Sequence, residues 1–153
     1  MKLGIIILCL ASASCQVKTK VDASENASLP LAGTWKLISG TTIDSTDTVV
    51  TNYTKGQSFI KIINNSHFAF LQHDLQKGKD SAASFSAGGG YYSLKDSLYI
   101  EHLEYCSARE WAGNHFDFVV SIHNDTLVQK GVEKVDKIGV NRINIEKYVR
   151  MKD

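Results

Sequence analysis

Apolar and polar residues alternate with a period close to two along most of this chain, beginning near residue 31. Such alternation is typical of β-strands that bury one face and expose the other. It is clearest over 115–123, where phenylalanine, valine and isoleucine recur at every second position, and it returns over 140–150. Similar runs predict further strands at 34–39, 57–64, 68–72, 82–87, 91–95, 98–106 and 126–133.

Turn-forming residues separate these runs, and no segment between them has the spacing of an amphipathic helix. Asparagine, aspartate, glycine, lysine and serine gather at 64–66, 77–80, 95–97 and 124–125. Eight to ten short strands at hairpin spacing predict an antiparallel meander. A meander of this length removes its open edges by closing on itself, so we expect an all-β protein whose strands form a barrel.

Three consecutive glycines, Gly88 to Gly90, interrupt the pattern between two predicted strands. A phosphate-binding loop would need a following Gly-Lys-Ser/Thr and a helix, whereas Tyr91 and Tyr92 continue here into a strand. We therefore expect a β-bulge or a sharp bend at which the barrel turns a corner.

The start of the chain differs in character from the rest. Met1-Lys2 precede an apolar run over 3–10, and small residues at 11–14 lead to Cys15. A basic beginning, a short apolar core and small residues predict a secretory signal, and the run is too short to span a bilayer as a helix. The mature protein is therefore expected outside the cytoplasm.

Small residues leading directly into a cysteine resemble the lipobox of bacterial lipoproteins. The resemblance implies cleavage before Cys15, acylation of that residue and anchoring to a membrane of the bacterial cell envelope. Ser12 departs from the pattern, which usually has leucine there. The alternative is cleavage after Ala13, which would leave a soluble periplasmic or secreted protein.

We expect three parts along the chain: a lipoprotein signal peptide at 1–14, a flexible tether at 15–29 and a β-barrel domain at 30–153. The tether is polar, with too few apolar residues to order itself. The residues that follow suffice for one domain with a hydrophobic core, but not for two. Pro30, the only proline in the sequence, marks the beginning of the domain.

Charge and cysteine content limit the possible functions and cross-links. Seventeen basic and sixteen acidic residues nearly cancel, and no basic cluster is present, so nucleic acid is not an expected partner. Of the three cysteines, Cys9 belongs to the leader and Cys15 to the lipobox, which leaves Cys106 alone in the domain. A Cys15–Cys106 disulfide is possible if Cys15 is not lipidated.

A short motif opens the first predicted strand. Gly33-Thr34-Trp35 resembles the G-x-W motif at the beginning of lipocalins and related calycin barrels. The resemblance implies that Trp35 closes one end of the barrel and that a basic residue of the last strand packs across its ring, either Arg142 or Arg150. A guanidinium over an indole contributes about 0.5–2 kcal/mol.

With the meander, the late arginines and the phrases at 88–94 and 99–105, the chain is similar over 31–150 to a family of exported bacterial lipocalin-like domains of unknown function. The resemblance implies the fold and the location but no reaction. The chain is shorter than typical lipocalins and lacks their other motifs and their disulfide.

The run 98–106 contains the most polar candidates for a binding site. Alternation places Tyr99, Glu101 and Tyr105 on one face, and we predict that this face points into the barrel. A buried glutamate must be hydrogen-bonded or shifted in pKa, and could orient a ligand; it could equally be bonded to a neighbouring strand or exposed. Aromatic residues predicted to line a cavity, or else to form the core, are Phe68, Phe70, Tyr92, Phe116 and Phe118.

Histidine chemistry is the other possibility that the sequence raises. The chain has five histidines, but they are scattered and have no zinc-binding motif around them, so we expect no metal and no other cofactor. His102 could still act with Glu101 or Glu104 as an acid and a base, provided that the side chains share a cleft.

The sequence thus predicts a lipid-anchored, non-catalytic barrel that binds a small apolar or amphipathic molecule in a cavity of a few hundred cubic ångströms. One alternative is an interaction or inhibitor module of the envelope, with a filled interior and an exposed apolar patch around Trp111. The other is an enzyme that uses the histidine and glutamates of 98–106.

Overall fold

The computed structural model describes residues 30–152, with the exception of 80 and 82. The predicted signal peptide, the predicted lipidation site Cys15 and the predicted tether at 15–29 lie outside the described residues. No helix within the described part of the chain has the length and apolar character needed to cross a membrane.

The described chain is built almost entirely of β-strands, joined by short turns and by two single-turn 3₁₀ helices. In chain order the elements are β1 (Gly33–Ile43), β2 (Thr48–Asn52), β3 (Gln57–Ile63), β4 (His67–Asp74), β5 (Phe85–Lys95), β6 (Leu98–Cys106), η1 (Arg109–Trp111), β7 (Asn114–His123), β8 (Thr126–Val135), η2 (Asp136–Ile138) and β9 (Val140–Arg150).

These strands form an antiparallel meander that closes into an eight-stranded barrel. From β3 to β9 each strand pairs with the next, and β9 returns to pair with β1 along most of its length. The first half of β1 also pairs with β3, which completes the ring. The predicted fold class, an all-β meander closed into a lipocalin-like barrel, is therefore confirmed.

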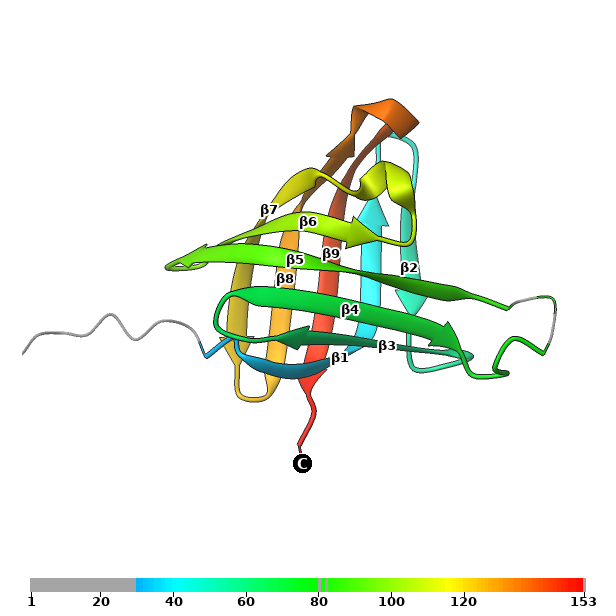
Figure 1. Ribbon diagram of the computed structural model, residues 1–153, viewed down its shortest axis with the longest axis horizontal. Coiled ribbons are helices and arrows are strands. Elements are labelled where there is room, and N and C mark those ends of the chain that lie inside the picture. The colour runs from blue at the N-terminus through cyan, green and yellow to red at the C-terminus, as the bar shows by residue number, and fades with distance from the viewer. Residues whose placement is uncertain (1–29, 80, 82, 153) are drawn as a thin grey trace, which may run out of the picture.

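Strand β1 changes direction within the barrel. Its pairing with β9 shifts register between Leu37 and Ser39, and its second half pairs with β2 instead of β3. Figure 1 shows β3 to β6 running across the view and β7 to β9 running along it, with β1 turning from one direction to the other. A bulge bends the strand that contains it, which accounts for this turn.

Two strands differ from the prediction. The runs at 82–87 and 91–95 belong to one strand, β5, because the glycines between them stay in the sheet. A bulge is indeed present there: Gly89 pairs with Tyr105 and Gly90 with Leu103, so Glu104 of β6 is the extra residue. A Cβ atom at Gly90 would overlap the carbonyl oxygen of His102, which explains why glycine is needed.

Strand β2 was not predicted from the alternation. Most of its residues are exposed, including both valines, Val49 and Val50. It has no buried face with which a polar face could alternate, because it pairs only with the second half of β1.

One end of the barrel is closed by Trp35, as the G-x-W resemblance implies. The Trp35 side chain is fully buried, and its Nε1 donates a hydrogen bond to the Leu31 carbonyl at 2.8 Å. The Arg150 guanidinium lies 4.0 Å from the centre of the indole and donates to the Ala32 carbonyl at 2.8 Å. Arg150, and not Arg142, therefore covers this tryptophan.

Gly33 is required at the same closed end. Its φ of +144° is rarely adopted by other residues, and a Cβ atom there would overlap Nη1 of Arg150. Glycine thus allows the arginine to reach across the indole. Apolar side chains pack beneath this lid as the core, which includes Leu37, Ile63, Phe68, Tyr99, Val120 and Leu127.

Candidate functional site

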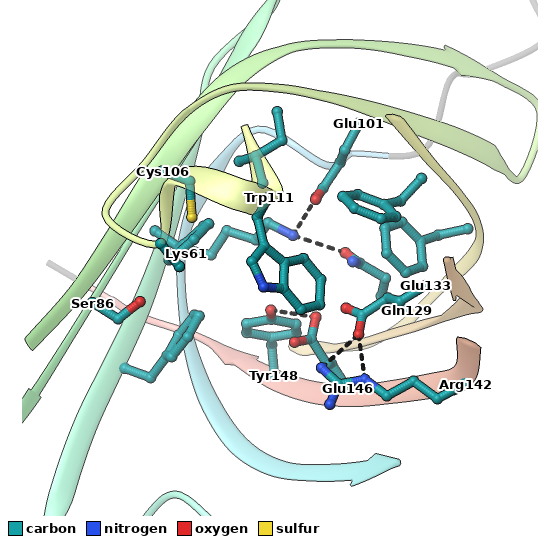
Figure 2. A pocket seen from close by; sticks show the side chains of 16 residues that line it. Lys61, Ser86, Glu101, Cys106, Trp111, Gln129, Glu133, Arg142, Glu146 and Tyr148 are labelled. Atoms are coloured by element: carbon teal, nitrogen blue, oxygen red, sulfur yellow. Dashed lines mark hydrogen bonds and ion pairs between the residues drawn. The ribbon is translucent and has the colours of Figure 1, made fainter. Parts of the chain in front are cut away.

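The half of the barrel next to η1 is hollow. It encloses a cavity of about 230 Å³ whose wall is part apolar and part charged. Figure 2 shows the side chains that surround it. The lining residues are Phe59, Lys61, Phe70, Ser86, Glu101, Leu103, Cys106, Ala108, Trp111, Phe116, Phe118, Gln129, Glu133, Arg142, Glu146 and Tyr148.

A buried polar group forms the inner end of the cavity. Lys61 of β3 donates to the Glu101 carboxylate on β6 and, at 3.0 Å, to Oε1 of Gln129 on β8. Lys61 is 3% exposed, Glu101 7% and Gln129 2%. A buried charge without a partner is costly, so the burial of each of these two charged groups is stabilised by the other. Strands from three parts of the barrel are thereby joined at its centre.

Aromatic rings surround the Lys61 ammonium. Its Nζ lies 5.3 Å from the centre of the Phe68 ring, 5.6 Å from that of Tyr99 and 5.7 Å from that of Tyr148. Burial raises the pKa of Glu101, and the Lys61 charge opposes that rise. Burial likewise raises the pKa of Tyr99, whose hydroxyl has no hydrogen-bond partner among the described residues.

A second ion pair lies nearer to the mouth of the cavity. Nε of Arg142 donates to Oε2 of Glu133 at 2.8 Å, and Nη2 lies 2.7 Å from the same oxygen. Asn144 donates to the other oxygen of Glu133 at 2.8 Å. Burial raises the pKa of Glu133, whereas the Arg142 charge lowers it. Both oxygens of this carboxylate are thus held in place.

The Trp111 side chain from η1 covers part of the mouth. Its ring lies 5.5 Å from the Arg142 guanidinium and 5.8 Å from the Phe116 ring, measured between centres. Further aromatic wall is supplied by Phe59 and Phe70, whose rings stack 5.6 Å apart. Trp111 is half-buried, so it is not the centre of an exposed apolar patch, as the interaction-module hypothesis expected.

Glu146 of β9 is the third carboxylate of the cavity wall. It accepts a hydrogen bond from the Tyr148 hydroxyl at 2.7 Å, and no cationic group of the described residues forms an ion pair with it. Burial raises the pKa of Tyr148, and the Glu146 charge raises it further. The lining residues thus contain two cations, Lys61 and Arg142, and three carboxylates.

The structure brings together half of the binding candidates chosen from the sequence. Glu101, Phe70, Phe116 and Phe118 line the cavity. Phe68 and Tyr99 are buried in the core and do not line it. Tyr92 is half-buried and donates its hydroxyl proton to the Asn64 carbonyl at 2.7 Å, which places it in the wall beside the β3–β4 turn.

The inward orientation predicted for Tyr105 is wrong. The residue is 71% exposed, whereas Tyr99 and Glu101 of the same strand are buried. The bulge at Glu104 adds one residue to β6, so the residues after it change faces. Cys106 consequently lines the cavity in place of Tyr105.

The acid–base arrangement considered for 98–106 does not form. Glu101 is inside the barrel, whereas His102 stacks on Tyr91 at 4.3 Å between ring centres and Glu104 is exposed. Adjacent residues of a strand point to opposite faces, so Glu101 and His102 share no cleft. Among the described residues no group of three histidine, cysteine or acidic side chains is arranged to hold a metal ion.

Several lining residues were not foreseen, because polar residues were expected to face outward. On β9 the alternation over 140–150 separates an isoleucine-rich face from a polar face, and the polar face is the one that points inward. The missed polar residues of the cavity are Lys61, Ser86, Gln129, Glu133, Glu146 and Tyr148, together with Arg142, which was proposed only as the cover of Trp35.

The raised pKa of Glu133 predicts a pH-dependent contribution to stability. Above the ordinary pKa of 4.5 the unfolded chain releases this proton while the folded protein retains it, so the contribution falls as the pH rises through the raised folded-state pKa. The difference in free energy of unfolding between the wild type and Glu133→Gln should therefore shift against the wild type over that range. Urea denaturation at a series of pH values measures it.

Glu110→Gln provides a control, since Glu110 is exposed in η1. The difference in free energy of unfolding between Glu110→Gln and the wild type should change little over the same pH range. If the free energy of unfolding of the wild type instead rises relative to that of Glu133→Gln as the pH increases above 4.5, the pKa of Glu133 is not raised.

No family model and no curated protein matches the chain, so its function must be inferred from the barrel and its cavity.

Proposed function

We propose that this protein is a non-catalytic binding module that takes a small amphipathic molecule into the hollow half of its barrel. The observation that carries the proposal is the cavity of about 230 Å³, which lies next to η1 while the other half of the barrel is packed. Aromatic walls with a few fixed polar groups are typical of small-molecule sites. The interaction-module hypothesis requires a filled interior, and the cavity does not fit that requirement.

The size of the cavity favours a small ligand. Pockets for drug-sized ligands have volumes of roughly 300–1,000 Å³, so about 230 Å³ suits a smaller molecule. Phe59, Phe70, Phe116 and Phe118 would contact its apolar part. The polar groups on Glu133 and Lys61 are already held by hydrogen bonds, so they lose little freedom when a ligand binds.

We further propose that the protein is held at a membrane of a bacterial cell envelope by lipid on Cys15. The support for this is the leader pattern and the small residues before Cys15. Two or three acyl chains on one residue give stable anchoring, because each buried methylene contributes about 0.8 kcal/mol.

Native mass spectrometry of the full-length protein purified from its own host tests both parts of the proposal. We expect a bound small molecule that is lost on denaturation, and an acyl mass on Cys15. Ser86→Phe, which places a ring in the cavity, should reduce the bound fraction. A wild-type protein without bound mass, or with the same occupancy in Ser86→Phe, would argue against binding in the cavity, and an unmodified cysteine would argue against the anchor.

A further inference from the structure

We propose that the ligand of this cavity is a small organic cation, an ammonium group on an apolar body, and that Glu146 receives the ammonium. The inference rests on the proposed binding function and names its ligand class. It is carried by the charge balance of the cavity, by the position of Glu146 and by the rings around it.

The cavity has one more carboxylate than it has cations. Lys61 is paired with Glu101, and Arg142 is paired with Glu133. Glu146 has only the Tyr148 hydroxyl as a hydrogen-bond donor among the described residues. An uncompensated charge within a protein wall is unfavourable, and a bound cation is one way to compensate it.

An anionic ligand fits this cavity poorly. Both cations have already been neutralised by carboxylates, and Arg142 also lies against the Trp111 ring. A carboxylate on the ligand would therefore meet Glu146 without a free positive charge to offset the repulsion. A neutral ligand avoids that repulsion but leaves the Glu146 charge uncompensated.

Glu146 lies opposite a position on the neighbouring strand that has no side chain. Its partner on β1 is Gly40, which has no side chain, and its partner on β8 is Gln129. The Tyr53 ring packs over Gly40, and Phe59 meets Tyr53 edge to face at 5.8 Å between ring centres. A side chain larger than glycine at position 40 would crowd Tyr53, since a Cβ atom would lie 3.1 Å from that ring.

Aromatic residues line the same cavity as Glu146, and one of them, Tyr148, donates its hydroxyl proton to the carboxylate. Phe59 lies 6.4 Å from Tyr148 between ring centres, and Trp111 covers the mouth above them. In Figure 2 the Glu146 carboxylate and the Tyr148 hydroxyl lie below Trp111, on the side away from Lys61. A cavity that combines a carboxylate with aromatic rings favours an organic ammonium ion, because ring faces also attract cations.

Three probes of nearly equal size and apolar body test the inference: 2-phenylethylamine, 2-phenylethanol and phenylacetate. Isothermal titration calorimetry at pH 7 with the full-length protein should give at least tenfold tighter binding for the amine than for either of the others. Glu146→Gln keeps the shape of the side chain and an acceptor for Tyr148 but removes the charge. It should weaken amine binding about tenfold and leave binding of the alcohol unchanged.

Glu110→Gln is the matched control, because it removes one negative charge from the exposed η1 helix. It should preserve the preference for the amine. If alcohol and carboxylate bind as tightly as the amine, or if Glu146→Gln retains the preference, the inference is overturned while binding in the cavity stands. If none of the probes binds the wild type, the inference is overturned, whereas the proposed binding function fails only if the host-purified protein also carries no bound molecule in native mass spectrometry.

Discussion

Replacing Lys61 with methionine should lower the free energy of unfolding by about 3–5 kcal/mol, because the substitution leaves the Glu101 carboxylate buried without its cation. The lysine ammonium contacts both Glu101 and Gln129 and is almost fully buried. Methionine matches the length of the lysine stem, so the change removes the charge with little loss of volume. Urea denaturation followed by tryptophan fluorescence measures the effect.

The size of this loss should depend on pH and on Glu101. Burial already raises the pKa of Glu101, and loss of Lys61 raises it further. The carboxyl group can then be buried as the neutral acid, so the destabilisation of Lys61→Met should shrink as the pH is lowered. The double variant Lys61→Met/Glu101→Leu should recover most of the stability at pH 7, since the buried charge is gone. A double variant no more stable than Lys61→Met would show that the charge is not the cause.

Replacing Trp35 with alanine is expected to cost about 3–5 kcal/mol, the range for deletion of a buried aromatic side chain. The indole is fully buried, bonded to the Leu31 carbonyl and covered by Arg150. Its removal opens the closed end of the barrel and leaves Arg150 without the ring. Thermal unfolding by circular dichroism, compared at equal protein concentration, measures the loss.

Trp111→Ala is the natural comparison, because that tryptophan is half-buried and lines the cavity. It removes the same side chain from a site that is already partly hydrated, so the cost should be clearly smaller. Equal destabilisation by the two substitutions would contradict the division of the barrel into a packed half and a hollow half.

The sequence predicted the architecture well where one face of a strand is apolar. The alternation of Phe116, Phe118 and Val120 marks a strand with its core face unambiguously. The G-x-W resemblance likewise indicated the role of Trp35, although it left Arg142 and Arg150 as equal candidates for the cover. Only the folded barrel shows which arginine lies beside the indole, because that depends on the register between β1 and β9.

The site was harder to predict, for two physical reasons. The bulge at Glu104 adds one residue to β6, so the side chains after it point to the opposite face of the sheet. A glutamate at this position gives no sequence signal for a bulge. In β9, period-two alternation separates two faces but does not say which points inward when the interior is polar. Glu146 and Tyr148 were therefore not distinguished from surface residues.

The chain enters the barrel on the side away from the mouth of the cavity. Pro30, where the described chain begins, is bonded at the closed end through its carbonyl oxygen to the Arg150 guanidinium. Figure 1 shows η1, whose Trp111 lines the cavity, on the opposite side of the barrel from Pro30. The proposed attachment through Cys15 would therefore leave the mouth of the cavity open to a ligand.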